Sequence, residues 1–194
     1  MKEVAEIFAE DLKKACEVLQ QGGIIVYPTD TIWGIGCDAT NTEAVGRVFA
    51  LKQRTDYKAM LVLIDNPARL SGYVANVPDI AWDLIEVSNK PLTIIYPNAK
   101  NLAFNLLGED GSVGIRITNE RFSHELCKLF RKPLVSTSAN ISGLPSPRLF
   151  REIAEAVKNG VDYVVRYRQD ETVSAEPSGI IKLCEDGCIQ IIRE

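Results

Sequence analysis

Apolar residues follow two alternating patterns along the chain, one at helical spacing and one in short continuous runs. In "EDLKKACEVLQQGG" the apolar side chains of Leu12, Ala15 and Leu19 recur every three or four positions, and Gly22-Gly23 close the segment. This spacing predicts a helix that ends at the glycines. The next stretch, "GIIVYP", is short, apolar and rich in β-branched residues, which indicates a buried strand.

The same alternation continues toward the end of the chain. Asn41 or Thr42 is a suitable N-cap for a helix over 42–51, in which Val45 and Val48 would face inward. Further helices are predicted at residues 67–74, 78–87, 121–130 and 148–160. Further strands are predicted at residues 59–64, 91–97, 112–117, 132–140, 163–166, 178–183 and 188–193.

Helices and strands that alternate in this way predict an α/β fold in which at least part of the sheet is parallel. The last two strands flank "CEDGC", which predicts a closing antiparallel hairpin and therefore a mixed sheet. No internal repeat, low-complexity run or linker-like change of composition divides the sequence. We therefore expect a single α/β domain over residues 1–194.

Composition and charge narrow the classes of function. Hydrophobic residues make up 46% and charged residues 25% of the chain, which is typical of a globular domain. No segment approaches the roughly 20 apolar residues that cross a bilayer, and the charged start "MKEVAEIFAEDLKKAC" is unlike a secretory signal, so a cytoplasmic protein is expected. The net charge of -4 disfavours a long nucleic-acid footprint but is compatible with a local basic site.

Metal and nucleophile motifs are scarce. The five cysteines show no CxxC spacing, and Cys184 and Cys188 bracket a turn where a zinc site would need two more ligands, so free thiols are expected. No GxxxxGK[ST], GxGxxG or GxSxG motif occurs. The one histidine, His124, has no second histidine at zinc-protease spacing and is interpreted as a helix-face residue.

One polar cluster follows the first predicted strand, in "YPTDTIWGIG". Thr29, Asp30 and Thr31 stand where the strand ends, a position that presents ligand-binding groups in α/β sheets. Gly34 and Gly36 would let the backbone approach a ligand closely. The same residues also suit a plain turn, because Thr and Asp cap backbone groups and Gly takes positive φ.

A second cluster is basic. Lys52, Arg54 and Lys58 follow the helix over 42–51 in "LKQRTDYK". Three closely spaced cations suit a polyphosphate, since each can neutralise non-bridging oxygens. Basic residues at a helix C-terminus equally complement the helix dipole and are often only solvated.

A third cluster ends the strand "PLVSTSAN", with Ser136, Thr137, Ser138 and Asn140. Such a run can offer hydroxyls and successive backbone N–H groups to an anion, although an ordinary polar loop with helix-capping serines has the same composition. Three polar strand ends in one domain, one of them basic, indicate a small anionic ligand, such as a nucleotide bound without a P-loop.

At these residues the sequence resembles the YrdC/TsaC family of threonylcarbamoyl-AMP synthases. "YPTDTIWGIG" looks like the family's aromatic-Pro-Thr-Glu-Thr-x-Tyr-Gly-x-Gly element, "KQR" like its Lys-x-Arg element and "STSAN" like its Ser-x-Asn element, in the expected order. The match runs from about Gly22 to Arg193. The length is similar to that of the single-domain form without a C-terminal extension.

The resemblance implies a twisted mixed sheet, flanked by helices, around an open and positively lined cavity. It implies that L-threonine, bicarbonate or CO₂, and ATP with Mg²⁺ give threonylcarbamoyl-AMP and pyrophosphate. Transferase proteins would then pass the threonylcarbamoyl group to tRNA, to make threonylcarbamoyladenosine. The family is also associated with binding of tRNA and double-stranded RNA.

The resemblance assigns roles to individual residues. L-Threonine would be bound by Thr29, Arg116, Ser136 and Ser178. ATP would be bound by Lys52, Arg54, Ser112, Ser138, Asn140, Ser146 and Arg193, and Lys58 joins this set from the basic cluster. Lys52 and Arg54, on the phosphates, would be the catalytic residues.

The sequence departs from the family pattern at several positions. The family motif Trp-Pro-Gly-Pro-Leu-Thr falls on Val87–Thr93, "VSNKPLT", where only Pro91-Leu92-Thr93 is kept. Substituted family positions are Asp30 for Glu, Trp33 for Tyr, Thr55 for Pro, Ala59-Met60 for Pro-Leu and Gly179 for Thr.

Because Lys-x-Arg and Ser-x-Asn are both kept, the sequence favours an enzyme. The alternatives are an RNA-binding module on the same fold and a nucleotide-binding relative with different carbamoyl chemistry.

Overall fold

A computed structural model describes residues 2–53, 60–184 and 188–194. Its α-helices are α1 (Lys2–Gln20), α2 (Thr42–Leu51), α3 (Asp79–Val87), α4 (Arg121–Phe130) and α5 (Glu155–Asn159). Its 3-10 helices are η1 (Pro67–Gly72), η2 (Phe104–Leu106) and η3 (Phe150–Glu152). Its strands are β1 (Ile25–Tyr27), β2 (Gly34–Gly36), β3 (Leu61–Ile64), β4 (Leu92–Tyr96), β5 (Val113–Ile117), β6 (Leu134–Ser138), β7 (Tyr163–Val164), β8 (Gly179–Leu183) and β9 (Ile189–Arg193).

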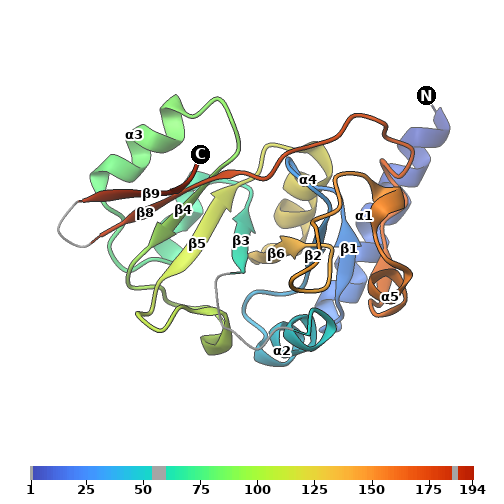
Figure 1. The fold of residues 1–194 in the computed structure, drawn as a ribbon, viewed down its shortest axis with the longest axis horizontal. Coiled ribbons are helices and arrows are strands. Elements are labelled where there is room, and N and C mark those ends of the chain that lie inside the picture. Colours follow the sequence, from blue (N-terminus) through green and yellow to red (C-terminus); the bar gives the residue numbers. More distant parts are fainter. Residues whose placement is uncertain (1, 54–59, 185–187) are drawn as a thin grey trace.

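The described strands form one mixed sheet in the order β7-β1-β2-β6-β3-β5-β4-β8-β9. The pairs β1–β7, β3–β5 and β4–β8 are parallel, and the other neighbours are antiparallel. The predicted α/β class with a mixed sheet is therefore confirmed. Figure 1 shows β6 crossing between two halves of the molecule, one built around β1 and β2 and the other around β3, β5, β4, β8 and β9.

Helices cover the two faces of the sheet unevenly. Leu63 and Leu134 pack in one apolar cluster with α1 and α4, whereas Val62, Ile64 and Ile115 pack in another with α2 and α3. Successive strand residues point to opposite faces, so these clusters lie on opposite sides of the sheet. Figure 1 shows α1 and α4 beside the β1 half, while the β4–β8–β9 half lies farther along.

Local capping agrees with the sequence at α2. Asn41 Oδ1 accepts hydrogen bonds from the backbone N–H groups of Glu43 (3.0 Å) and Ala44 (3.1 Å), which satisfies two of the unpaired donors at the helix start. The first helix also ends as predicted, because Gly22 adopts a φ of 75° two residues after the end of α1.

Two predictions of local structure are wrong. The helix predicted over 148–160 is broken into η3 and α5, because Ile153 adopts an extended conformation (φ -69°, ψ 121°) and buries its side chain in the core. Strand β2 was not predicted, because "GIG" lacks the pattern of a strand. Its Gly36 needs no positive φ; a Cβ there would lie 2.5 Å from Tyr27 Cε1 and 2.7 Å from the Val135 carbonyl oxygen, so glycine lets β2 pack closely.

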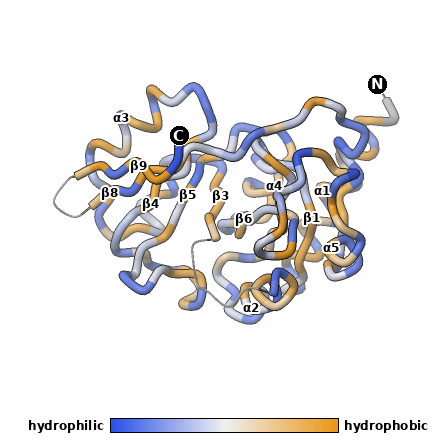
Figure 2. Tube along the Cα trace, viewed as in Figure 1, coloured by the Kyte–Doolittle hydropathy of each residue, from blue (hydrophilic) through white to orange (hydrophobic). Residues whose placement is uncertain are grey.

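The C-terminal strand β9 lies at one edge of the sheet, and Figure 2 shows its apolar residues in orange. Ile189, Ile191 and Ile192 are 46%, 64% and 50% exposed. Cys184 and Cys188 face each other next to this hairpin, where the Cys184 N–H donates to the Cys188 carbonyl at 3.0 Å. The five cysteines, all within the described residues, form no disulfide, as the sequence predicted. Within the described segments no helix is long and apolar enough to cross a membrane.

Candidate active site

A cavity of about 220 Å³ lies on the α1/α4 face of the sheet, where the two halves meet; we call it the inner cavity. It is lined by the turn after β1, by β2, β5 and β6, by the loop after β6, and by β8 and β9 with the segment that precedes them. Strand alternation explains why Ser136 and Arg116 lie on this face of the sheet. Ser136 shares one face of β6 with Leu134, and Arg116 of β5 pairs with Leu63 of β3. Leu134 and Leu63 both pack against α1 and α4.

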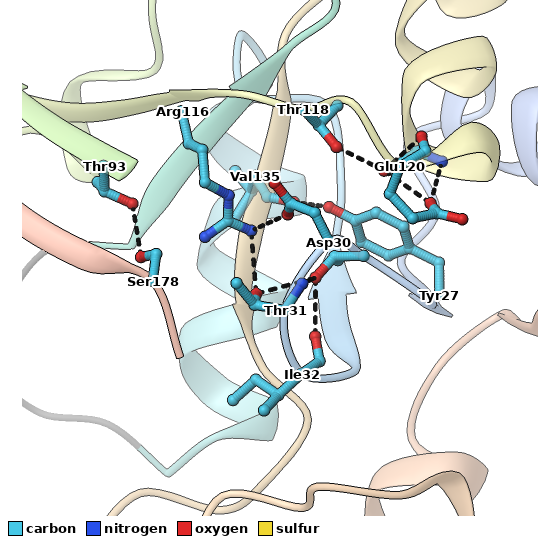
Figure 3. Close-up of polar contacts among 12 residues, drawn as sticks. Tyr27, Asp30, Thr31, Ile32, Thr93, Arg116, Thr118, Glu120, Val135 and Ser178 are labelled. Carbon is cyan, nitrogen blue, oxygen red and sulfur yellow. Dashed lines mark hydrogen bonds and ion pairs between the residues drawn. The ribbon is translucent and has the colours of Figure 1, made fainter. Parts of the chain in front are cut away.

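Arg116 is the central cation of the inner cavity. Its side chain is 3% exposed, and Nη2 lies 3.0 Å from Asp30 Oδ1 and 3.2 Å from Thr31 Oγ1 (Figure 3). Burial raises the pKa of the Asp30 carboxyl, and the positive charge of Arg116 opposes that rise. The turn after β1 thus fixes one side of the guanidinium before any ligand binds.

A second guanidinium comes from the last strand. Arg193 pairs with Ile180 across β9 and β8, and its Nε donates to the Ser178 carbonyl at 2.8 Å. Burial and the positive charge of Arg116 both lower the pKa of Arg193. Two like charges that line one cavity repel each other, and an anion bound between them would remove this repulsion, so the inner cavity is suited to an anion.

Hydroxyl groups stand beside these cations. Ser178 Oγ lies 2.9 Å from Thr93 Oγ1, and both residues are 2% exposed (Figure 3). Ser136 and Ser138 line the cavity from alternate positions of β6, and Ser146 lines it from the following loop. Thr93 was not predicted as a site residue, although it belongs to the Pro-Leu-Thr remnant of the family motif.

Gly34 belongs to the cavity wall, as the sequence suggested. It pairs with Ser138, and a Cβ on it would lie 3.2 Å from Ser136 Oγ and 3.4 Å from Thr29 Cγ2. Gly36, by contrast, packs against Tyr27 and is not among the residues that line the cavity.

Thr29 is 2% exposed and its hydroxyl is engaged within the turn. It accepts from the Thr31 N–H at 3.0 Å and donates to the Ile32 carbonyl at 2.9 Å. Thr31, rather than Thr29, lines the inner cavity. In this structure Thr29 therefore shapes the turn that presents Thr31 and Asp30 to Arg116.

Lys52 lies behind the cavity wall. Its side-chain Nζ donates to the carbonyls of Ser138 (2.6 Å) and Asn140 (2.7 Å), and Asn140 Nδ2 in turn donates to the Leu144 carbonyl at 2.5 Å. Lys52 is 2% exposed. The Lys52 ammonium therefore holds the end of β6 and the following loop in place through these two carbonyls.

Ser112 lies immediately before β5, four residues from Arg116, and lines a separate hollow of about 120 Å³ that Gly114 and Lys182 also line. Ser112, Gly114 and Arg116 occupy alternate positions and so face the same side of the sheet. Arg54 and Lys58 lie outside the described residues.

The structure thus brings six predicted residues into one cavity and holds others around it. Those that line the inner cavity are Arg116, Ser136, Ser138, Ser146, Ser178 and Arg193. A residue that sequence reasoning missed is Arg168, whose Nη1 donates to the Thr29 carbonyl (3.1 Å) and pairs with Glu120 (3.1 Å). These groups are far apart in the sequence, so no local pattern could have linked them.

Metal ligands do not cluster in the part of the chain that the structure describes: no group of three or more His, Cys, Asp or Glu side chains is placed to hold an ion. The site is instead built from guanidinium, hydroxyl and backbone groups. The fold and the inner cavity thus define an α/β protein with an anion-binding site at the junction of a mixed sheet.

Comparison with known proteins identifies the family. The Sua5/YciO/YrdC family model, described as "Telomere recombination", matches residues 17–194. A threonylcarbamoyl-AMP synthase of Pseudoalteromonas translucida is 38% identical over 171 residues, which cover 86% of this chain and 89% of that protein. The chain belongs to the Sua5/YciO/YrdC family, and the resemblance drawn from the motifs is confirmed.

Solved structures agree with this assignment. A double variant of Sua5 from P. abyssi superposes with a TM-score of 0.85 at 26% identity, over 94% of this chain and 55% of that one. P. abyssi Sua5 complexed with L-threonine gives a TM-score of 0.79 at 24% identity, over 89% of this chain and 50% of that one. The present chain therefore spans about half the length of these two Sua5 chains.

Proposed function

We propose that this protein is a threonylcarbamoyl-AMP synthase, a nucleotidyltransferase that makes threonylcarbamoyladenylate and pyrophosphate from L-threonine, bicarbonate or CO₂, and ATP. The observation that carries the proposal is the pair Arg116 and Arg193, which line one cavity together with the hydroxyls of Ser136 and Ser178. Family membership, the name of the Pseudoalteromonas relative and the threonine complex of P. abyssi Sua5 support it.

Threonine recognition would centre on Arg116. Its guanidinium can donate two parallel hydrogen bonds to a carboxylate, which fixes the direction of the amino group. Ser136 and Ser178 would bind the remaining polar atoms of the amino acid. Thr93, which is hydrogen-bonded to Ser178, would orient that hydroxyl.

The chemistry needs two steps. The threonine nitrogen attacks the carbon of CO₂ and loses a proton, which gives a carbamate. A carbamate oxygen then attacks the α-phosphorus of ATP, and the bond from that phosphorus to the pyrophosphate oxygen breaks. Little covalent help is required, so positioning and charge neutralisation would provide most of the catalysis.

The ATP phosphates would extend from the inner cavity toward the hollow beside Ser112. Arg193 would contact the nucleotide through guanidinium N–H groups other than the Nε–H that Ser178 uses. Ser138, Asn140 and Ser146 would contact it from β6 and the following loop. Lys52 would contribute through the two loop carbonyls that it holds.

Mg²⁺ would neutralise charge on the departing pyrophosphate and would be carried on ATP by phosphates and water, as is common for this ion. Arg54 and Lys58 remain assigned to the phosphates on the basis of the sequence. We expect Arg54→Ala to lower turnover at least ~10-fold, the effect of losing one transition-state charge contact, and unchanged turnover would refute that role.

Pyrophosphate release by the purified protein with ATP, Mg²⁺, L-threonine and bicarbonate tests the proposal, and it should depend on threonine. Release without threonine would instead favour a relative with different carbamoyl chemistry. Absent turnover, together with tight RNA binding that weakens steeply with salt, would favour an RNA-binding module. In cells the product would pass to tRNA threonylcarbamoyl transferase proteins, and the cytoplasm is the proposed location.

A further inference from the structure

Arg168 does not line the inner cavity, yet it contacts both segments that carry the Asp30–Arg116 pair. It adopts a φ of 70° in the turn that follows β7, and its side chain is 23% exposed. Nη1 donates to the Thr29 carbonyl at 3.1 Å and lies 3.1 Å from Glu120 Oε1. Thr29 directly precedes Asp30, and Glu120 follows Arg116 by four residues. One guanidinium therefore joins the turn after β1 to the segment after β5.

The guanidinium of Arg168 is itself held in one orientation. Glu171 accepts two hydrogen bonds from it, one from Nε at 2.6 Å and one from Nη2 at 2.8 Å. This paired geometry suits a guanidinium and not an ammonium. Burial lowers the pKa of Arg168, but Glu171 and Glu120 raise it by more, so the side chain is charged. Nη1 is therefore fixed in the direction of the Thr29 carbonyl.

Glu120 is held on its other side by the start of α4. Its Oε2 accepts from the Ser123 N–H at 2.8 Å, which caps the helix, and lies 2.8 Å from Ser123 Oγ. Ser123 Oγ in turn lies 2.7 Å from Thr118 Oγ1, directly after β5 (Figure 3). Arg168 therefore binds a carboxylate that is already attached to the strand of Arg116.

Arg168 also balances charge beside Asp30. Burial raises the pKa of the Asp30 carboxyl, the positive charge of Arg116 lowers it, and the negative charge of Glu120 raises it again. Arg168 pairs with Glu120 and compensates that negative charge. Without Arg168, Glu120 would favour the neutral form of Asp30 and weaken its ion pair with Arg116.

We propose that Arg168 is a positioning residue of the L-threonine site. It holds the Thr29 carbonyl and Glu120 relative to each other. Asp30 thereby stays paired with Arg116, which presents its guanidinium to the inner cavity. The identity of the ligand rests on the proposed function, whereas the link from Arg168 to the Asp30–Arg116 pair is measurable without substrate.

Arg168→Met tests the effect on catalysis, because methionine keeps an apolar stem but removes the charge and every donor. We expect the KM for L-threonine in pyrophosphate release to rise about 10-fold, the effect of losing one hydrogen bond to a charged group. The KM for ATP should change less than about 2-fold, because the proposed ATP contacts come from other elements. Arg168→Lys, which keeps the charge without the paired geometry, should show a smaller rise in the KM for L-threonine.

The Asp30 carboxyl gives a readout that needs no substrate. Its titration is followed by carbon NMR in the unaltered protein and in Arg168→Met. The pKa of Asp30 should be higher in the variant, because Glu120 is then uncompensated.

Arg69→Met is the matched control. Arg69 is 24% exposed, pairs with Asp65 and donates to the Arg131 carbonyl at 2.6 Å, so it resembles Arg168 in burial and in partners. It joins η1 to the end of α4, however, and does not contact the turn after β1. Its loss should leave the Asp30 titration and the KM for L-threonine unchanged, even where the free energy of unfolding falls.

Three results would overturn the proposal: an unchanged pKa of Asp30 in a natively folded Arg168→Met, equal rises in the KM for L-threonine and for ATP, or the same changes in Arg69→Met. Where Arg168→Met does not fold, Arg168→Lys is measured in the same way, and unchanged values there overturn the proposal equally. Absence of threonine-dependent turnover in the unaltered protein would instead refute the proposed function. In that case the Asp30 titration still decides whether Arg168 maintains the Asp30–Arg116 pair.

Discussion

Arg116 illustrates how single residues set the character of the site. Its guanidinium is almost fully buried, with Asp30 and Thr31 on one side and the inner cavity on the other. A buried ion pair of this kind adds little stability by itself, but removal of one partner leaves an uncompensated charge and costs roughly 3–5 kcal/mol. Asp30 therefore keeps Arg116 in place, and an incoming carboxylate needs no reorganisation of the arginine.

Arg116→Lys tests this arrangement. A lysine ammonium is a point charge and cannot bind the turn and a substrate carboxylate with the fork geometry of arginine. We expect the KM for L-threonine in pyrophosphate release to rise about 10- to 100-fold, with a smaller change in kcat.

Arg47→Lys is the matched control, because Arg47 is half exposed and pairs with Asp162 on the surface. An unchanged KM in Arg116→Lys, or the same rise in Arg47→Lys, would contradict the assigned role.

At this scale the sequence could identify residue types but not their contacts. Arg116, Ser136 and Ser178 were named through motifs, and the structure brings them into one cavity. Thr29 was expected to face a substrate; in the structure its hydroxyl forms hydrogen bonds within the turn, and its role toward L-threonine stays a prediction. The peptide geometry that forms this turn is not determined by residue identity alone.

At the scale of elements, the connection from α2 to β6 matters most for the site. Lys52 follows α2 directly, and its ammonium joins the carbonyls of Ser138 and Asn140, at the end of β6 and in the next loop. The Ser142 N–H returns a bond to the Lys52 carbonyl at 2.9 Å. Hydrogen bonds therefore run from Lys52 to the loop and from the loop back to Lys52, which limits the movement of the cavity wall at Ser138.

Lys52→Met should uncouple these elements, since methionine keeps the length of the side chain but donates no hydrogen bonds. Hydrogen bonds to charged groups contribute roughly 1.5–3 kcal/mol each, so we expect the loss of the two bonds to lower the free energy of unfolding in urea by about 3–6 kcal/mol.

Lys13→Met is the control, because Lys13 lies on the exposed side of α1. It should change the free energy of unfolding by less than about 0.5 kcal/mol. A stable Lys52→Met variant with weakened ATP binding would instead mean that Lys52 acts on phosphates alone.

Elements with a strong local signal were predicted well. The helix over 42–51 has an Asn cap and an apolar stripe, and the structure reproduces its bounds as α2. The segment over 148–160 has a comparable stripe but lacks an interior cap signal where Ile153 turns into the core. Burial of one side chain there overrides helix propensity, which is a tertiary effect that local pattern does not encode.

For the whole molecule, the alternation of helices and strands was enough to predict a mixed α/β sheet, but not the order of its strands. That order places β6 between β2 and β3, so residues from both halves of the chain meet at the inner cavity. Ion pairs also join segments that are distant in the sequence. Lys182 Nζ of β8 lies 2.6 Å from Asp110 Oδ2 in the loop before β5.

The Asp110–Lys182 pair makes part of the stability depend on pH. The hydrogen bond from Lys182 lowers the pKa of Asp110 to about 2, below the value of about 3.9 in an unfolded chain. Its contribution is therefore complete above about pH 5 and is lost as the pH falls from about 4 to 2.

Urea unfolding of the protein and of Asp110→Asn across this range measures the effect. The difference in unfolding free energy should be at most ~1 kcal/mol, because the pair is partly exposed, and should vanish near pH 2. Asp170→Asn serves as an exposed control. A difference that stays constant with pH would exclude the pair as its source.

Two of the residues that complete the inner cavity, Ser178 and Arg193, lie in the last part of the chain, on and before strands that return to pair beside β4. During synthesis the turn, β5 and β6 emerge from the ribosome well before them. A nascent chain can therefore begin to pack its sheet while the cavity still lacks one wall and one of its two cations. Substrate capture becomes available only after β8 and β9 have been synthesised and have paired beside β4, so the ligand can stabilise the folded domain but cannot guide the early stages of its folding.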